Sequence, residues 1–289
     1  MMPWRWWRAL WRPALADVRL LVSDVDGTLI IGEEALPDST AELLRSLHRH
    51  GVQLAFASAR PYPSLAVLVR QAHVPAWIIS LDGALLHAPN GELRFSVPFP
   101  AEVLRSLVEL ASHYAVHYAT FTPEGLYRMA EVHIPSYLND PLLPRFQAQL
   151  LADFFRHPAV LFCLSGPQAH ALGFVQAVER LPRRIRRHLS IAAVESASQP
   201  GLTVVEIRMR AAHKGTAAQA LQKFLGIPRR ATLAIGDYRN DLPLFAIAGL
   251  RVAMADAVAE LRSKADWVTE RPAIERGIDD VLRRLLQER

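Results

Sequence analysis

The stretch Leu21–Ile30, LVSDVDGTLI, places two carboxylates, Asp24 and Asp26, at the end of an apolar run and follows them with Gly27 and Thr28. An apolar run of this kind is typical of a buried strand. Burying a carboxylate costs free energy unless another group pairs with it. The stretch therefore predicts a functional strand end, and the rest of the chain should supply the partners of the two carboxylates.

The chain has 289 residues, which is enough for a core domain with an insert. Its composition, 51% apolar and 21% charged, is that of a globular protein. The single cysteine, Cys163, excludes an intramolecular disulfide and fits a reducing, cytoplasmic setting. No run approaches the roughly 20 apolar residues of a membrane-spanning helix. Arginines interrupt the N-terminal stretch where a secretory signal needs a continuous apolar segment.

The net charge of +5 is concentrated in two places. Arg5, Arg8 and Arg12 lie near the N-terminus, and five arginines lie in the stretch 180–189, RLPRRIRRHL. Basic clusters can bind nucleic acid, but the chain has no recognisable nucleic-acid-binding motif. Arginines around one amphipathic turn are typical of a solvated face. We therefore expect no nucleic-acid partner.

Residues 1–13, MMPWRWWRALWRP, form a Trp/Arg-rich extension that holds four of the six tryptophans. Trp4, Trp7 and Trp11 have the i, i+3, i+7 spacing of one helix face, with arginines between them. Such a segment can lie on an anionic membrane surface, or it can pack its indole rings on the protein's own core or on a second subunit. One short helix is a weak membrane anchor, so packing within a monomer or a homodimer is the favoured alternative.

After residue 14 the sequence alternates between apolar runs and amphipathic segments. It predicts elements in the order β-α-β-α-β at residues 18–26, 39–50, 52–58, 62–72 and 77–82. This alternation is typical of parallel strands joined by helical crossovers. In such a sheet, ligands bind at the carboxyl ends of the strands.

The pattern changes after Gly83. A turn signal at Asn90–Gly91 predicts a hairpin, and helices and short strands follow in mixed order up to about residue 210. The α/β alternation then returns. The sequence thus predicts an α/β fold, with a doubly wound, parallel-sheet, Rossmann-like core at residues 14–83 and 211–289 and an inserted α+β domain at residues 84–210.

Polar side chains stand at the ends of the predicted core strands. Because the carboxyl ends of parallel strands meet at one edge of a sheet, we expect these side chains to lie close together. A lysine at the start of a predicted helix adds a cation where the helix N-terminus already attracts anions. The set is Asp24, Asp26, Ser58, Asp82, Lys214 and Asp237, the last followed by Asn240 and Asp241 in the next turn.

These residue types suit phosphate chemistry. Asp24, Asp26 and Asp237 offer the few carboxylate oxygens that Mg²⁺ prefers, and Ser58 and Lys214 would hold the remaining phosphate oxygens. Strand geometry puts residues i and i+2 on the same side, so Asp24 can attack phosphorus while Asp26 stands by the leaving oxygen. Asp26 would protonate that oxygen and then take a proton from the water that cleaves the aspartyl-phosphate.

With these residues assembled, the sequence resembles the haloacid dehalogenase (HAD) superfamily, and more narrowly its Cof-type branch, which carries a type IIB cap. Four motifs in order carry the resemblance: DVDGT at 24–28, FASARP at 56–61, HKG at 213–215 and GDYRND at 236–241. The resemblance implies an HAD core whose cap, at residues 84–210, selects the substrate. It also implies an Mg²⁺-dependent phosphatase for a small phosphorylated metabolite, such as a sugar phosphate or a nucleotide-like monoester.

The resemblance also implies a role for each matching residue. Asp24 is the nucleophile and Asp26 the acid/base. The metal ligands are Asp24, Asp26 and Asp237, with Asp241 supporting them. Arg60 either touches the substrate or pairs with a surface carboxylate. The residues that would bind phosphate or substrate are Ser58, Arg60, Asp82, Gly83, Lys214 and Asn240.

The chain departs from the branch in several places. Ser58 stands where Thr is usual, and Ala59 stands where Gly is usual. Asp82–Gly83 replaces Asn-Gly, and Glu275–Ile278 replaces a stretch that usually contains Asp-Gly-Val. We expect the extra negative charge of Asp82 to weaken phosphate binding or to change its contacts.

The same residues are compatible with other functions. A phosphotransferase of the phosphomannomutase kind would share the nucleophile and a related cap. A non-catalytic member would bind a phosphorylated ligand without turnover, although it would be expected to lack Asp24 or Asp26. His113 and His117 have the i, i+4 spacing of zinc ligands, but no third ligand stands at a suitable spacing, so we expect no zinc site.

Overall fold

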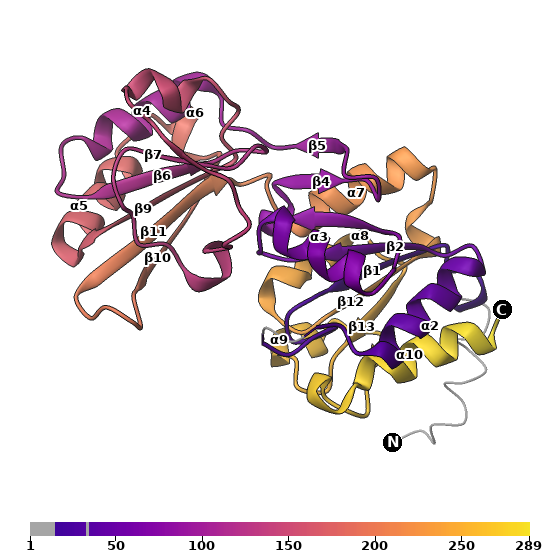
Figure 1. Ribbon diagram of the computed structural model, residues 1–289. Coiled ribbons are helices and arrows are strands. Elements are labelled where there is room, and N and C mark those ends of the chain that lie inside the picture. Colours follow the sequence, from indigo (N-terminus) through magenta and orange to yellow (C-terminus); the bar gives the residue numbers. More distant parts are fainter. Residues whose placement is uncertain (1–14, 33–34) are drawn as a thin grey trace. The chain divides into compact units, whose positions relative to one another are not determined.

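The computed structural model describes residues 15–32 and 35–289 (Figure 1). The Trp/Arg-rich extension at residues 1–13 lies outside the described residues. The chain divides into two compact units. The described part of the first unit comprises residues 15–32, 35–58, 65–95 and 213–289, and the second unit comprises Ala59–Ser64 and Ser96–Ala212.

The first unit is built on an eight-stranded sheet with the order β14-β13-β12-β1-β2-β3-β4-β5. Neighbouring strands from β14 to β3 are parallel. The central strands β1 and β12 are buried along their whole length, as is usual for a parallel sheet with both faces covered. The strands are β1 (Leu20–Asp24), β2 (Gln53–Ala57), β3 (Ala76–Ser80), β4 (Leu85–His87), β5 (Leu93–Ser96), β12 (Thr232–Gly236), β13 (Leu250–Ala253) and β14 (Trp267–Val268). This architecture confirms the predicted fold class.

Six helices accompany this sheet among the described residues: α2 (Asp38–Arg49), α3 (Tyr62–Gln71), α7 (Lys214–Leu225), α8 (Leu242–Ile247), α9 (Ala259–Arg262) and α10 (Gly277–Gln287). Helices α2 and α10 lie side by side (Figure 1). Thr40 Oγ1 donates to Asp279 Oδ1 at 2.6 Å, so a hydroxyl at the start of α2 binds the neighbouring helix instead of capping its own. In the described part of the chain, no helix has both the length and the apolar character that a membrane crossing requires.

The hairpin predicted at Asn90–Gly91 extends the first sheet. Gly91 has φ 87° and its amide donates to the carbonyl of Ala88, so the chain reverses between β4 and β5. Strand β4 then pairs antiparallel with β3. The sequence pattern assigns residues 84–95 to the insert, whereas contacts in the structure place these residues in the first unit. The edge of β3 provides backbone partners for β4 that the hairpin sequence alone does not reveal.

The second unit contains a six-stranded sheet with the order β10-β11-β9-β6-β7-β8. Alternate residues of β9 and β11, such as Phe162 and Val205, pack with residues of α4 and α5 in one apolar core. The strands are β6 (His117–Phe121), β7 (Leu126–Arg128), β8 (Arg145–Gln147), β9 (Leu161–Pro167), β10 (Leu189–Glu195) and β11 (Leu202–Met209). The helices are α4 (Ala101–Ala111), α5 (Gln168–Glu179) and α6 (Arg183–Arg186).

Two features of the second unit have no catalytic character. Helix α4 ends at Ala111 and β6 begins at His117, so His113 and His117 do not share a helix face. Cys163 is fully buried in β9, and burial raises the pKa of its thiol well above the ordinary value. A thiol without thiolate character is a poor nucleophile.

The buried His87 makes the stability of the protein depend on pH. His87 lies in β4 with 4% of its surface exposed, and burial lowers its pKa from 6.5 to about 4. The unfolded chain therefore binds a proton at His87 below pH 6.5, whereas the folded chain binds this proton only at about pH 4 and below. We expect His87 to reduce the free energy of unfolding by about 3 kcal/mol between pH 7 and pH 4. Urea titrations of the parent and His87→Leu across this range measure the effect, and equal pH slopes for the two proteins would refute it.

Candidate active site

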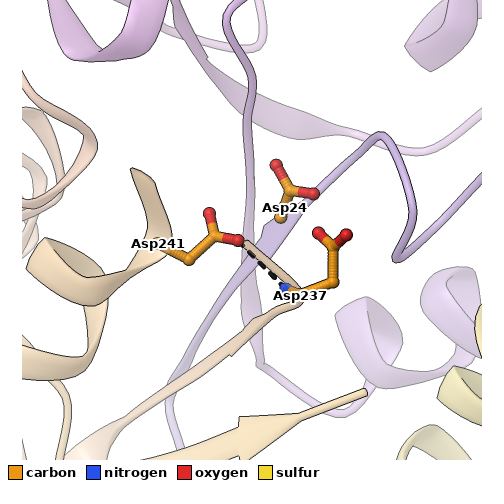
Figure 2. Close-up of side chains that lie close together, drawn as sticks. All are labelled: Asp24, Asp237 and Asp241. Carbon is orange, nitrogen blue, oxygen red and sulfur yellow. Dashed lines mark hydrogen bonds between the residues drawn. The ribbon is translucent and has the colours of Figure 1, made fainter. Parts of the chain in front are cut away.

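The site is built at the carboxyl ends of two paired strands. Strands β1 and β12 are parallel, with Ser23 opposite Ile235. Asp24 ends β1, and Asp237 follows directly after β12, so the register brings both carboxylates to the same edge (Figure 2). Asp24 is 4% exposed, which means that its charge has been removed from water. Such a charge needs a partner, as the sequence suggested.

Asp24, Asp237 and Asp241 form an aspartate triad (Figure 2). One carboxylate oxygen from each residue lies within 4.8 Å of those from the other two. Within the described part of the chain, no other group of three acidic, histidine or cysteine side chains comes this close together. Carboxylate oxygens in this arrangement are consistent with a divalent metal site.

Lys214 is the cation inside this cluster. It is the first residue of α7 and is 1% exposed. Its ammonium donates to Asp24 Oδ1, and it donates to Asp241 Oδ1 at 2.7 Å. Burial alone would lower the pKa of Lys214, but the negative charges of Asp24 and Asp241 outweigh burial and raise it. Lys214 therefore stays protonated, and the triad with Lys214 keeps two negative charges when all three carboxylates are ionised.

Asp241 also fixes the loop that carries Asp237. Its Oδ2 accepts hydrogen bonds from the backbone amides of Asp237 and Tyr238, both at 3.0 Å, and it is fully buried. The sequence predicted that Asp241 supports the metal ligands. In the structure Asp241 belongs to the aspartate triad and also holds the loop that carries Asp237. Oδ1 faces Lys214, and Oδ2 closes the turn.

The turn after β1 requires glycine. Gly27 has φ 83°, and a Cβ at this position would collide with the carboxylate of Asp237. The neighbouring Thr28, which the sequence reasoning did not select, donates from Oγ1 to Asp237 Oδ1 at 3.5 Å and is 1% exposed. The sequence does contain a signal for a role of Thr28 in the site, because this residue directly follows the Asp-x-Asp-Gly stretch. Thr28 thus joins the turn after β1 to the triad.

Asp26 is not one of the three residues of the triad. Ser58 Oγ donates to Asp26 Oδ2 at 3.0 Å, which joins the ends of β1 and β2. The side-by-side placement of Asp24 and Asp26 was expected from strand geometry. Strand β1 ends at Asp24, however, and the amides of Leu29 and Ile30 turn back to the carbonyl of Val25. The alternation of a strand therefore does not extend to Asp26.

The loop after β3, residues 81–83, contacts the loop after β2, the side chain of Asn240 and the backbone just before α7. Leu81, Asp82 and Gly83 have φ values of 48°, 55° and 94°, a left-handed path that is unfavourable for the two residues with a Cβ. The amide of Asp82 donates to the carbonyl of Ser58, and Asn240 Nδ2 donates to Asp82 Oδ1, both at 3.0 Å. A Cβ at Gly83 would collide with the backbone of His213, next to Lys214.

The structure thus brings most of the selected residues into one network. It joins Asp24, Asp237, Asp241 and Lys214 directly, and it links Ser58 with Asp26 and Asp82 with Asn240. Arg60 is half-buried and belongs, with Ala59–Ser64, to the second compact unit. Its role stays a prediction from sequence.

Two carboxylates of the triad, those of Asp24 and Asp237, hold protons more tightly than free aspartates do. Burial and the negative charge of Asp241 raise the pKa of Asp24 well above its ordinary value. Burial raises the pKa of Asp237 from 3.8 to about 6, and the charge of Asp241 adds to this effect. The triad therefore disfavours its own full ionisation when no metal is bound.

These pKa values predict a pH-dependent metal affinity. A divalent metal at this site would bind the ionised carboxylates, so protons would compete with it below about pH 6. We expect the affinity for Mg²⁺ to fall by about tenfold or more between pH 7.5 and pH 5, with proton release on binding. Calorimetric titrations at both pH values, in buffers of different ionisation enthalpy, measure both quantities. Equal affinity at the two pH values, without proton release, would contradict this description of the triad.

Comparison with known proteins places this site in a family. The sequence pattern of the haloacid dehalogenase-like hydrolases matches residues 21–282. The HMP-PP phosphatase of Cronobacter sakazakii is 28% identical over 244 residues, which cover 84% of this chain and 86% of that protein. The 5-amino-6-(5-phospho-D-ribitylamino)uracil phosphatase YitU of Bacillus subtilis is 25% identical over 276 residues, which cover 90% of this chain and 96% of that protein.

A solved structure shares this fold over most of the chain. The HAD subclass IIB sugar phosphatase BT4131 superposes with a TM-score of 0.68 at 18% sequence identity, covering 92% of this chain and 98% of that one. The chain belongs to the haloacid dehalogenase-like hydrolases. Within that family it is a phosphatase of the Cof-type branch, a phosphoric monoester hydrolase, as the resemblance implied. It shares its fold with the subclass IIB sugar phosphatase.

Proposed function

We propose that the protein is a Mg²⁺-dependent phosphohydrolase that cleaves small phosphomonoesters through a phosphorylated Asp24. The observation that carries the proposal is the buried triad of Asp24, Asp237 and Asp241 with Lys214 inside it. When its three carboxylates are ionised, the triad with Lys214 carries two negative charges in excess, which match the charge of one divalent cation. Oxygen ligands are those that Mg²⁺ prefers.

The triad would hold the ion, with Asp24 and Asp237 as ligands. When bound, Mg²⁺ supplies electrostatic stabilisation of the anionic phosphate next to an anionic nucleophile. Asp24 attacks phosphorus with a carboxylate oxygen, forming an O–P bond while the bond to the alcohol oxygen breaks. Lys214 neutralises part of the charge on the phosphate, because its ammonium already touches the nucleophile.

Asp26 is the proposed proton carrier. It donates a proton to the departing alcohol oxygen and later accepts one from the water that hydrolyses the acyl phosphate. The hydrogen bond from Ser58 Oγ to Asp26 Oδ2, at 3.0 Å, holds the carboxyl group in one orientation. Asp26 is half-buried, which leaves it accessible to substrate and water.

The relatives support a proposal for the substrate class. HMP-PP phosphatase and the phosphoribitylaminouracil phosphatase are named for small phosphorylated metabolites. We infer a small phosphorylated metabolite for this chain as well, a sugar phosphate or a nucleotide-like monoester, acted on in the cytoplasm. The inserted cap, proposed from the sequence at residues 84–210, would choose among such substrates.

The test is phosphate release from a panel of sugar phosphates and nucleoside monophosphates, with Mg²⁺ and with EDTA. We expect turnover of at least one ester that EDTA abolishes and Mg²⁺ restores. The absence of turnover with every ester in Mg²⁺ would contradict the proposal. A requirement for a bisphosphate activator would instead indicate a phosphotransferase.

The charge of Asp82 gives a prediction about substrate affinity. Asp82 accepts a hydrogen bond from Asn240, and its negative charge contributes to the raised pKa of Lys214. A carboxylate beside the phosphate-binding cation repels phosphate. We expect Asp82→Asn, which keeps the acceptor oxygen, to lower KM by about three- to tenfold with a smaller change in kcat.

The matched control is Asp17→Asn, which removes the same charge from an exposed position before β1. Steady-state kinetics at low ionic strength would measure both variants. An unchanged or higher KM for Asp82→Asn would show that the Asp82 charge does not act against the phosphate.

A further inference from the structure

Strand β10 forms one edge of the six-stranded sheet in the second unit and pairs there with β11 (Figure 1). At the two ends of this pair, the amide of Ser196 donates to the carbonyl of Leu202, and the amide of Arg210 donates to the carbonyl of His188. Backbone groups alternate in direction along a strand, so the even-numbered residues of β10 bond to β11. The amides and carbonyls of its odd-numbered residues therefore point to the open edge.

Arg210 occupies the first part of this edge. Its guanidinium group donates to the carbonyls of Arg187 and Leu189, at 3.1 and 3.0 Å. From Ile191 to Glu195, no group in the described part of the chain bonds to the outward amides and carbonyls. The open part of the edge thus extends from Ile191 to Glu195, and Ala193 is its central residue.

The open edge lacks the features that protect edge strands from pairing, which are charged residues, proline and bulges. The sequence of β10 is LSIAAVE, with one charged residue at its end and no proline. Its pairing with β11 is continuous over all seven residues. Ala192, Ala193 and Val194 are exposed, Val194 with 66% of its surface. An apolar edge with unpaired backbone groups is suited to bind one further strand.

The open part of the edge is complementary to itself. In an antiparallel pair centred on Ala193, this residue lies opposite Ala193 of a second copy, and Ile191 lies opposite Glu195. Each of these facing pairs can exchange two hydrogen bonds, so every outward amide and carbonyl from Ile191 to Glu195 finds a partner. Glu195 then faces an apolar residue instead of a like charge, which would be destabilising.

The arginine-rich stretch before β10 favours the same arrangement. Arg183, Arg184, Arg186 and Arg187 are exposed and directly precede the strand. Antiparallel pairing places the two copies of this stretch at opposite ends of the paired strands. Parallel pairing in register would place them side by side, where like charges repel.

We propose that two copies of the chain form a symmetric dimer through antiparallel pairing of β10 with β10 of the second copy. The two six-stranded sheets then become one continuous sheet. The proposal is independent of the proposed phosphatase activity, because no residue of β10 belongs to the candidate active site.

The first test is analytical ultracentrifugation of the full chain over a range of concentrations. We expect an average mass above that of one chain, rising with concentration. Val194→Lys places a charge on the apolar edge and should raise the dimer dissociation constant by about tenfold or more. The matched control is Leu172→Lys, which makes the same change at an exposed apolar residue of α5 in the same unit. This control should dimerise as the parent does.

The thermal melting profile verifies that Val194→Lys is folded. If it is not, Ala193→Pro replaces it, because proline removes the central outward amide and is tolerated on edge strands.

A disulfide tests the register of the pair. Facing residues that exchange hydrogen bonds have their Cα atoms about 5.5 Å apart, which a disulfide can bridge. Ala193→Cys should therefore form a disulfide between two copies under mild oxidation, whereas Leu172→Cys should not. The native Cys163 is buried in both variants. A parent that stays monomeric, a dimer that the edge variants leave intact, or equal cross-linking of the two cysteine variants would overturn the proposal.

Discussion

Asp24→Asn is expected to lower phosphate release by about 10³-fold or more, because the amide oxygen cannot replace the attacking carboxylate. The substitution keeps the size of the side chain at the end of β1. The pKa of Asp24 is raised by burial and by the charge of Asp241, so the ionised form is disfavoured in the metal-free protein. A neutral side chain should therefore leave the melting temperature in EDTA unchanged or higher.

The matched control for this experiment is Asp256→Asn. Asp256 is exposed, and its charge acts on Asp237 from outside the triad. This variant should retain most of the activity of the parent. If a folded Asp24→Asn protein kept turnover within tenfold of the parent, Asp24 would not be the nucleophile.

Lys214→Met is expected to have the largest effect on stability. Lys214 is 1% exposed and lies between Asp24 and Asp241, which are both buried. Removing the ammonium group leaves two buried carboxylates without their cation, which costs about 3–5 kcal/mol in the free energy of unfolding. The cost should decrease as the pH falls, because protonation of Asp24 then removes the uncompensated charge.

Urea unfolding in EDTA, at pH 7.5 and pH 5, measures both effects. Lys223→Met is the matched control, since Lys223 is exposed on the same helix, α7. It should change the free energy of unfolding by no more than about 0.5 kcal/mol. Equal losses in the two variants would mean that the loss reflects the helix and not the buried ion pairs.

The parallel sheet was predictable from sequence because its signals are local. Each of the central strands β1, β2 and β12 is an apolar run that ends in a polar residue or is followed directly by one, and each crossover contains an amphipathic helix. The same rule brought Asp24 and Asp237 together, although 213 positions separate their numbers, since parallel strands end at one edge. The position of Lys214 at the start of a helix was equally local.

Features that depend on long-range pairing were not predictable in this way. The hairpin of β4 and β5 joins the core sheet because β3 offers a free edge, a fact that the hairpin sequence does not contain. Ser39 and Thr40 have the composition of a helix cap, yet Asp279 in α10 accepts their hydrogen bonds. Both outcomes depend on elements distant in sequence.

The position of Asp26 has a different origin. The prediction that Asp26 lies on the same side as Asp24 assumed that β1 continues for two more residues, whereas β1 ends at Asp24. The sequence shows Gly27, but it does not show that strand β1 ends at Asp24. In the structure Asp26 accepts a hydrogen bond from Ser58, which follows β2.

The central claim is that Asp24 carries the phosphoryl group during turnover. Its most direct test is acid quenching of the enzyme during turnover with Mg²⁺ and its best ester, followed by peptide mapping by mass spectrometry. We predict one added phosphoryl group on the peptide that contains Asp24, absent without Mg²⁺ and absent in Asp24→Asn. Rapid turnover with no phosphorylated Asp24 peptide at any quench time, or a phosphoryl group on another side chain, would contradict this mechanism.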